Sequence, residues 1–251
     1  MTKSIKTALI LSLILASSVC AQDWNTRSID LANERNTLTW VDSLNQINII
    51  YEYYGVYHTK WTGSGWSKTL IYQSANAGDL EVDSTGTPHL VLLHTGINYP
   101  YYYYMDGTGW HSEQINDVSM PTVLPSIALD ANNNPHVIYK LSTNLYHAFK
   151  DTTTGLWNDE LISNDNVAPD YDVAIDNSNN IYVVYRASSN YLKMAYYDGD
   201  SWGIQFVDST FGAGAYCEIS IDENDVPHIS YYHETDSTLK YATLSSPKKK
   251  K

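Results

Sequence analysis

Three carboxylates occupy one repeated place in the chain, at the start of a short apolar segment. Asp79, Asp172 and Glu218 each stand four residues before an Asp that opens a polar turn. Glycoside hydrolysis needs two separated carboxyl groups with different pKa values, because one protonates the leaving group while the other acts as base or nucleophile. If these segments lie side by side around an axis, the three acids could share one axial mouth. Acids in such a place also bind water or a cation, so catalysis is an alternative rather than the main expectation.

A second set of residues lies in segments that differ from one part of the chain to the next. Aromatic rings stack on the C–H faces of sugars, while amide, carboxylate and guanidinium groups bond to hydroxyls. Irregular loops usually carry function, so we expect a ligand site on this loop face; ordinary solvated loops in a Tyr-rich protein are the alternative. The predicted ligand-binding residues are Tyr53, Tyr54, His94, Asn98, Tyr99, Arg186, Asn190, Tyr191, His233 and Glu234.

Two patterns suggest metal sites, and both have a simpler interpretation. His89, His136 and His228 each follow a Pro at matching places, but equivalent positions in a repeat do not converge on one point as metal ligands must. The turn that starts at Asp130 is rich in oxygen side chains, yet its twelfth position is Leu141 rather than an acid. We therefore expect rim or packing histidines and Asp-capped turns, with no metal and no cofactor.

An apolar residue followed by Asp recurs along the whole chain and defines a repeat. The steps between successive pairs are 41, 47, 46 and 46 residues. The pairs are Val41-Asp42, Val82-Asp83, Leu129-Asp130, Ile175-Asp176 and Ile221-Asp222. Each is followed by two extended apolar runs, and in the first four repeats a tight turn then ends in Trp66, Trp110, Trp157 or Trp202. Four short strands at this period predict one propeller blade per repeat, with the tryptophans wedged between blades.

The last repeat stops before a Trp-led fourth strand. Residues 24–30 open with Trp-Asn, as residues 157–163 do, and have the same length. Pairing this segment with the last three strands would remove an exposed sheet edge. The expected fold is therefore an all-β, five-bladed β-propeller with four-stranded antiparallel blades, whose last blade is closed by the N-terminal strand.

Several repeats resemble known propeller motifs. Residues 173–183 are similar to an NHL-type repeat, and the turns 106–110 and 198–202 resemble the Asp-box of sialidase-like propellers. The Asp-box Ser and the arginine triad of sialidases are absent from the matching places, so the resemblance does not imply sialidase activity. Five blades would resemble the tachylectin type of sugar-binding propeller, and that likeness is one of architecture.

The sequence predicts that the N-terminal end is a cleaved export signal and that the C-terminal end is a solvent-exposed tail. Lys3 and Lys6 precede an apolar run and a small-residue cleavage site, which predicts a signal peptide over residues 1–21. Residues 22–246 would form one propeller domain, and residues 247–251 a Lys-rich tail. Lipid attachment at Cys20 is disfavoured, because the preceding residues fit a lipobox poorly. Cleavage leaves Cys217 without a partner for an internal disulfide.

The net charge of the chain limits the classes of partner that it can bind. Losing two lysines with the leader takes the net charge from −13 to −15, which makes nucleic acid a poor partner. No further stretch is apolar enough to span a bilayer. We expect a secreted protein, extracellular or periplasmic, that recognises a glycan or protein ligand without catalysis. Carbohydrate binding is the leading function; a protein-binding adhesion or surface module is the alternative, and a glycoside hydrolase is third.

Overall fold

Five hairpin turns repeat one hydrogen-bond pattern, which explains the recurring Asp. Asp176 Oδ1 accepts the backbone N–H groups of Ser178 at 2.8 Å and Asn180 at 2.9 Å. The same pattern, two and four residues on, is found at Asp42, Asp83, Asp130 and Asp222. The residue three places after each Asp has a left-handed backbone, and these residues are Asn45, Gly86, Asn133, Asn179 and Asp225. Gly, Asn and Asp tolerate that conformation best, so the prediction of Asp-capped turns is confirmed.

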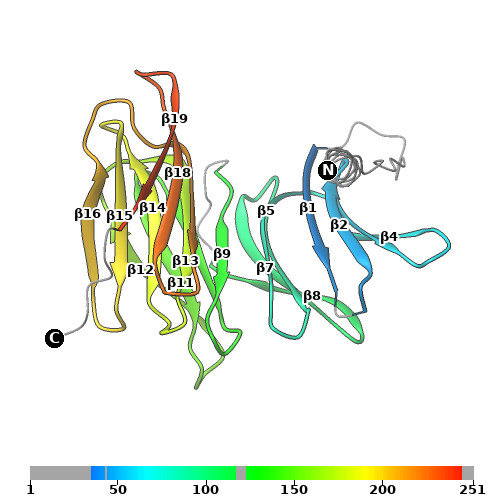
Figure 1. Cartoon of the computed structure of the whole chain (residues 1–251). Coiled ribbons are helices and arrows are strands. Elements are labelled where there is room, and N and C mark those ends of the chain that lie inside the picture. Colours follow the sequence, from blue (N-terminus) through cyan, green and yellow to red (C-terminus); the bar gives the residue numbers. More distant parts are fainter. Residues whose placement is uncertain (1–34, 43, 117–122, 245–251) are drawn as a thin grey trace, which may run out of the picture. The chain divides into compact units, whose positions relative to one another are not determined.

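The computed structural model describes residues 35–42, 44–116 and 123–244, which all belong to one compact unit, Glu34–Lys251 (Figure 1). The described residues form antiparallel sheets in which most strands pair with their neighbours along the chain. The predicted signal peptide, the N-terminal strand 24–30, Cys20 and the tail 247–251 lie outside the described residues. Within the described ranges, no helix is long and apolar enough to cross a membrane.

The strands fall into five sheets, numbered here in chain order. Sheet 1 contains β1 (Arg35–Val41), β2 (Ile47–Glu52), β3 (Val56–Trp61) and β4 (Trp66–Tyr72). Sheet 2 contains β5 (Ala75–Val82), β6 (Pro88–His94), β7 (Tyr99–Asp106) and β8 (Gly109–Gln114). Sheet 3 contains β9 (Ser126–Leu129), β10 (Pro135–Leu141), β11 (Asn144–Lys150) and β12 (Trp157–Ser163). Sheet 4 contains β13 (Val167–Ile175), β14 (Ile181–Ala187), β15 (Tyr191–Tyr197) and β16 (Trp202–Asp208). Sheet 5 contains β17 (Ala215–Ile221), β18 (Pro227–His233) and β19 (Thr238–Thr243).

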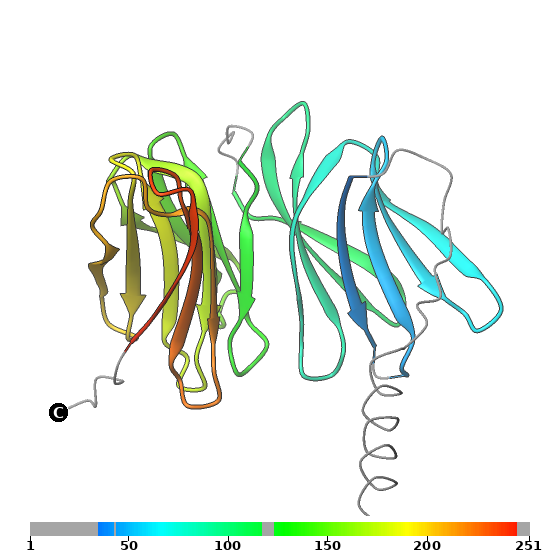
Figure 2. The ribbon, with the colours of Figure 1, turned by 45° about the horizontal axis from the view of Figure 1, so that its top comes forward.

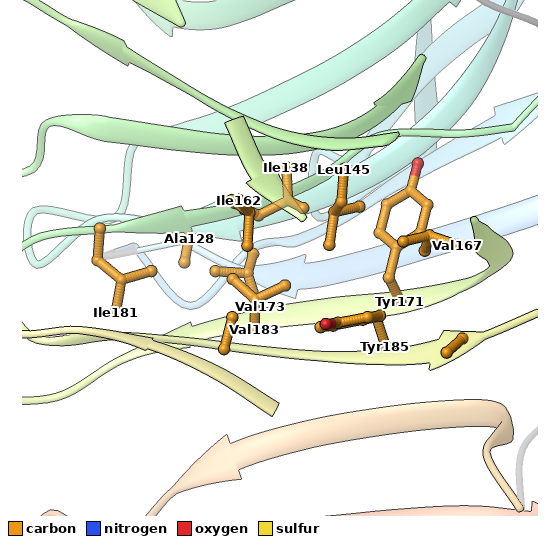
Figure 3. Close-up of a cluster of buried hydrophobic side chains, with 12 residues drawn as sticks. Ala128, Ile138, Leu145, Ile162, Val167, Tyr171, Val173, Ile181, Val183 and Tyr185 are labelled. Carbon is orange, nitrogen blue, oxygen red and sulfur yellow. The ribbon is translucent and has the colours of Figure 1, made fainter. Parts of the chain in front are cut away.

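Consecutive sheets pack face to face through apolar side chains. The first strands lie next to one another in chain order, β1 by β5, β5 by β9, β9 by β13 and β13 by β17 (Figure 2). Between sheets 3 and 4, Ile138 and Leu145 meet Val173, Val183 and Tyr185 in a buried cluster (Figure 3). Three further clusters of this kind fill the other junctions. Burial of these faces is what holds the sheets together.

Tryptophans close three of these junctions, as predicted. Each indole N–H reaches the preceding sheet: Trp157 Nε1 donates to Glu113 at 3.0 Å and Trp202 Nε1 to Glu160 at 2.9 Å. Trp110 Nε1 lies 3.4 Å from His58 Nδ1 in the same way. The rings are half-buried against the apolar clusters, so each Trp joins apolar packing to a directional bond between sheets.

The last sheet differs from the prediction of four strands per blade. Sheet 5 has three described strands, and β19 pairs with β18 alone among them. The repeat pattern fixes the strands within a unit, but it does not show which segment, if any, pairs with an edge. The assumption that the N-terminal segment must fill this place is therefore not a consequence of the repeat.

Removing the indole of Trp157 should destabilise the junction between sheets 2 and 3. Trp157→Ala is expected to lower the free energy of unfolding by about 3 kcal/mol, because a half-buried aromatic and its bond to Glu113 are lost together. Urea unfolding of this variant beside Tyr54→Ala, which removes an exposed ring, provides the measurement. Equal unfolding midpoints for the two variants would show that the indole is not part of the packing.

Candidate functional site

A charged cluster joins the ends of sheets 4 and 5. Arg186, at the end of β14, donates from Nη2 to Glu234 Oε2 at 2.5 Å and from Nη1 to Glu234 Oε1 at 3.2 Å. Nη2 also donates to Asn190 Oδ1 at 2.8 Å. Arg186 is largely buried while Glu234 is half exposed. This bidentate pair therefore spans the junction and presents its carboxylate to solvent.

The loop between β16 and β17 is held against this cluster by backbone bonds. Gly212 and Ala213 donate to the carbonyl of Asn190, and Glu234 donates to the carbonyl of Gly212 at 2.8 Å. Gly214 has φ of 99°, and a Cβ there would come within 3.3 Å of Arg186 Cβ. A side chain there would crowd the stem of Arg186 and would be strained at this positive φ, which glycine adopts readily. The loop is thus fixed between the turns that carry Asn190 and Glu234.

An exposed aromatic residue is held beside the same cluster. Tyr216 has a left-handed φ of 52°, an uncommon conformation for an aromatic residue. Its backbone N–H donates to Asp170 Oδ1 at 2.9 Å, and Asp170 Oδ2 lies 3.7 Å from Arg186 Nη1. Tyr216, near the start of β17, and Phe211, in the loop before this strand, are both strongly exposed. Carboxylates, a guanidinium and an amide therefore meet at one junction, to which the backbone of an exposed Tyr is also bonded.

The Nε–H group of Arg186 is a further hydrogen-bond donor in this cluster. It is buried and has no hydrogen-bond partner among the described residues. Buried donors are nearly always bonded in folded proteins, so this N–H marks a place where a buried water would be stabilised.

The predicted residues of sheets 1 and 2 lie at other junctions. Tyr53 and Tyr54 form an edge-to-face pair with ring centroids 4.9 Å apart in the β2–β3 turn, where Tyr54 is strongly exposed. Asn98 has a left-handed φ of 54° in the β6–β7 turn and precedes the half-buried Tyr99. These pairs do not join the Arg186 cluster, so the predicted set is divided among separate sheets.

Two predicted histidines are packed inside the protein. His94 stacks between Tyr72 and Tyr101 with centroid distances of 3.7 Å on both sides, and burial lowers its pKa to about 4. His233 is buried, with Nε2 2.9 Å from Thr210 Oγ1. Tyr191 contacts Phe206 edge to face at 6.0 Å. His94 therefore packs between strands β4 and β7, and His233 holds Thr210 of the β16–β17 loop.

The histidines that follow Pro each bind a neighbour within their own sheet. His136 Nδ1 lies 2.8 Å from His147 Nε2, and His228 Nδ1 lies 2.6 Å from the hydroxyl of Tyr241. His89 contacts the Tyr102 hydroxyl in the equivalent way at 2.5 Å. Among the residues that the structure describes, no group of three His, Cys, Asp or Glu side chains is placed to hold a metal ion.

Two of the three repeated carboxylates tie the inner strands together. Asp79 Oδ2 accepts the Ile127 N–H of the next sheet at 3.0 Å, and Asp172 Oδ2 accepts the Ile219 N–H at 2.9 Å. Each carboxylate therefore bonds to the backbone one sheet further along. Glu218, the third of the set, is exposed on β17.

A serine joins the two buried carboxylates. Ser126 Oγ lies 2.9 Å from Asp79 Oδ2 and 2.9 Å from Asp172 Oδ1. A hydroxyl carries one hydrogen and can donate to only one acid, so the second contact needs a protonated carboxyl group. Burial supplies it, because desolvation raises the pKa of Asp79 and raises that of Asp172 to about 6. At a pH below about 6, a protonated Asp172 lets both contacts with Ser126 be hydrogen bonds.

Comparison with known proteins was made by sequence and by structure. No protein-family model matches the chain, and no curated protein matches its sequence. AofleA from Arthrobotrys oligospora is similar in structure, with a TM-score of 0.61 and 12% identity over 82% of this chain and 67% of that chain. Aleuria aurantia lectin, in complex with α-methyl-L-fucoside, gives 0.60 and 13% over 83% and 74%. SapL1 lectin, also with an α-methyl fucoside, gives 0.58 and 15% over 84% and 77%. At these identities the likeness concerns the fold.

These neighbours correct the predicted blade number. The fold is an all-β propeller fold, but Aleuria aurantia lectin is a six-bladed β-propeller. The five described sheets match part of such a propeller, so the prediction of a five-bladed ring closed by the N-terminal strand is wrong. Blade number follows from the angle at which sheets pack, which side-chain sizes at the junctions decide. The prediction of five blades rested on the number of repeats and assumed that these units alone close the ring.

The sequence identified part of the charged cluster. Arg186, Asn190 and Glu234 were predicted on the loop face and are brought into direct contact. Asp170, Phe211 and Tyr216 were missed, because they precede the repeat or lie in the loop between sheets. The segment Phe211-Gly212-Ala213-Gly214 held a usable signal, since two glycines beside one of only three Phe residues mark a close backbone approach.

Asp172→Asn tests the shared proton. The pKa of Asp172 is about 6 in the folded protein and 3.8 in the unfolded chain. Its contribution to the free energy of unfolding is therefore fully present below pH 3.8 and is lost as the pH rises through about 6. The side-chain amide of the variant can still accept the Ile219 N–H, but it does not ionise. Relative to the variant, the wild type should therefore lose about 2 kcal/mol of unfolding free energy between pH 4 and pH 8. Urea unfolding across this range measures the difference.

Glu218→Gln is the matched control, because it removes an exposed carboxylate from the same repeated position. Its stability should follow the wild type at every pH. If the Asp172→Asn curve also runs parallel to the wild type, the two acids do not share a proton.

Proposed function

We propose that this protein binds carbohydrate without catalysis, at the surface where Arg186, Asn190 and Glu234 meet. The observation that carries the proposal is the bidentate Arg186–Glu234 pair across the junction of sheets 4 and 5, beside exposed aromatic rings. The fold neighbours support it. AofleA has a similar fold, and two further neighbours are lectins whose structures hold a fucoside.

The cluster supplies the groups that a sugar needs. Adjacent sugar hydroxyls both donate and accept, and they can bridge a carboxylate and a guanidinium. Glu234 is half exposed and can accept hydrogen bonds from a sugar, and its two bonds from Arg186 hold its carboxylate in place. Tyr216 and Phe211 offer faces for the C–H side of a pyranose ring. The loop backbone is fixed by its bonds to Asn190 and Glu234, which reduces the entropy lost on binding.

The buried acids favour the binding interpretation over hydrolysis. Asp79 and Asp172 spend their oxygens on backbone N–H groups of the next sheet and on Ser126, so they are committed to joining strands. We further propose that the protein acts outside the cell, on the basis of the signal peptide predicted over residues 1–21. The alternative is a protein ligand. Binding of a partner protein in the absence of any glycan would identify this case.

The proposal predicts a loss of glycan binding in Arg186→Ala. A glycan array with the purified protein identifies a sugar, and calorimetric titration measures its affinity. The variant should bind roughly thirtyfold more weakly, because a charge-assisted hydrogen bond contributes about 2 kcal/mol. Lys60→Ala is the matched control, as it breaks a 2.8 Å ion pair with Asp42 in sheet 1 and should leave affinity unchanged.

Aromatic stacking is tested separately. Tyr216→Ala should weaken binding by about 1 kcal/mol, or roughly fivefold, with little change in melting temperature because the ring is exposed. Tyr54→Ala, Tyr99→Ala and Tyr191→Ala probe the other predicted loop residues in the same titration. Unchanged affinity in Arg186→Ala and Tyr216→Ala, with a loss in one of these three, would move the site to another junction. Failure to bind any glycan would overturn the proposed function.

A further inference from the structure

Sheets 4 and 5 carry far more acidic than basic side chains. Residues 167–243 contain twelve Asp and Glu residues against three basic residues. Lys193 Nζ lies 2.7 Å from Asp165 Oδ2, and Lys240 Nζ lies 3.0 Å from Asp236 Oδ2. Both lysines are therefore already paired with carboxylates, and an anionic ligand would have to compete with these ion pairs.

Arg186, the third basic residue, is outnumbered by acids in its own cluster. Its two Nη atoms bind the carboxylate of Glu234, and Nη1 also lies 3.7 Å from Asp170 Oδ2. Two carboxylates against one guanidinium leave this cluster with a net negative charge. The cluster proposed to bind sugar is therefore anionic, although an arginine lies at its centre.

The carboxylates at this surface are more exposed than the cations that they pair with. The side chain of Glu234 is 48% exposed, against 11% for Arg186. In the same turn between β18 and β19, the side chain of Asp236 is 50% exposed, against 30% for its partner Lys240. A ligand that approaches this turn therefore meets negative charge first.

The backbone donors beside the cluster are also occupied. Clusters of free backbone N–H groups can bind anions in proteins. Here the N–H groups of Gly212 and Ala213 donate to the carbonyl of Asn190. The N–H of Glu234 donates to the carbonyl of Gly212, and that of Tyr216 donates to a carboxylate oxygen. A sulfate or carboxylate group placed beside these residues would find these four donors already bonded.

We propose that this site selects saccharides by charge: it accepts uncharged sugars and excludes those that carry a sulfate or carboxylate group, with Glu234 as the specificity-determining residue. The proposal rests on the sugar-binding function proposed above. A sugar hydroxyl can donate a hydrogen bond to the half-exposed carboxylate of Glu234. An ionised sulfate or carboxylate group has no hydrogen to donate and is repelled by this side chain, which disfavours the wrong ligand as well as favouring the right one.

Glycans that differ by one charged group test the proposal. The probes are an array of neutral galactose, glucose, mannose and fucose glycans, each printed beside its sulfated forms. Calorimetric titration then compares the neutral glycan that binds best with its sulfated forms. In about 0.05 M NaCl the sulfated forms should bind at least about tenfold more weakly. This ratio should fall at least about twofold in about 0.5 M NaCl, because salt screens repulsion between charges and does not relieve a steric clash.

Glu234→Gln removes the charge and keeps a side-chain oxygen that can accept hydrogen bonds. The neutral glycan should lose about threefold in affinity, because the bond from Arg186 is no longer charge-assisted. The ratio between neutral and sulfated forms should narrow to about threefold or less, because the repulsion is gone.

Glu223→Gln is the matched control, since Glu223 is exposed in the turn between β17 and β18, at the opposite end of sheet 5. It changes the net charge of the protein by the same amount and should leave both affinities unchanged. Melting temperatures within a few degrees of the wild type establish that the variants fold. A sulfated glycan bound as tightly as its neutral parent overturns the proposal, as does a ratio that salt or Glu234→Gln leaves unchanged. Both results would leave sugar binding intact, whereas an array without any bound glycan overturns the proposed function and this inference with it.

Discussion

The structure depends on burying both faces of each inner sheet. Val183 and Val184 are consecutive in β14 and point to opposite sides, yet both are fully buried. Val183 packs toward sheet 3 and Val184 toward sheet 5. A four-stranded sheet cannot satisfy two such faces alone, so each unit is stable only between neighbours. The period in the mid-forties is the length of chain that builds one such unit.

This constraint decides how polar groups are used at the junctions. A polar atom between two packed faces must find a partner, since burial without one is costly. Trp202 bonds to Glu160, Asp172 to the backbone of Ile219, and the Tyr171 hydroxyl to the carbonyl of Leu124 at 2.8 Å. Each bond joins one sheet to the next. Asp79 and Asp172 accept backbone N–H groups of the next sheet in this way and so align the inner strands.

The Arg186 cluster differs from these structural bonds because it is not repeated. The places equivalent to Arg186 hold Glu52, Leu93, Lys140 and Tyr232 in the other sheets. An ion pair needed for packing alone would be expected at more than one junction. The cluster also reaches the surface at its Glu234 end and carries an exposed Tyr in a strained conformation, a combination associated with binding sites rather than with scaffolds.

The sequence by itself determined the local units: the Asp-capped turns, the strands that follow them, and the tryptophans at the junctions. Each of these depends on interactions within a few residues or on one repeated apolar pattern. The sequence also placed Arg186, Asn190 and Glu234 on one loop face, because they interrupt the repeat. Tertiary structure alone decided which of the ten predicted loop residues meet, since contact between Arg186 and Glu234 spans 48 residues of chain. It also decided that Asp79 and Asp172 both contact Ser126, because the approach of three inner strands depends on the packing of many side chains at once and not on the spacing of any motif.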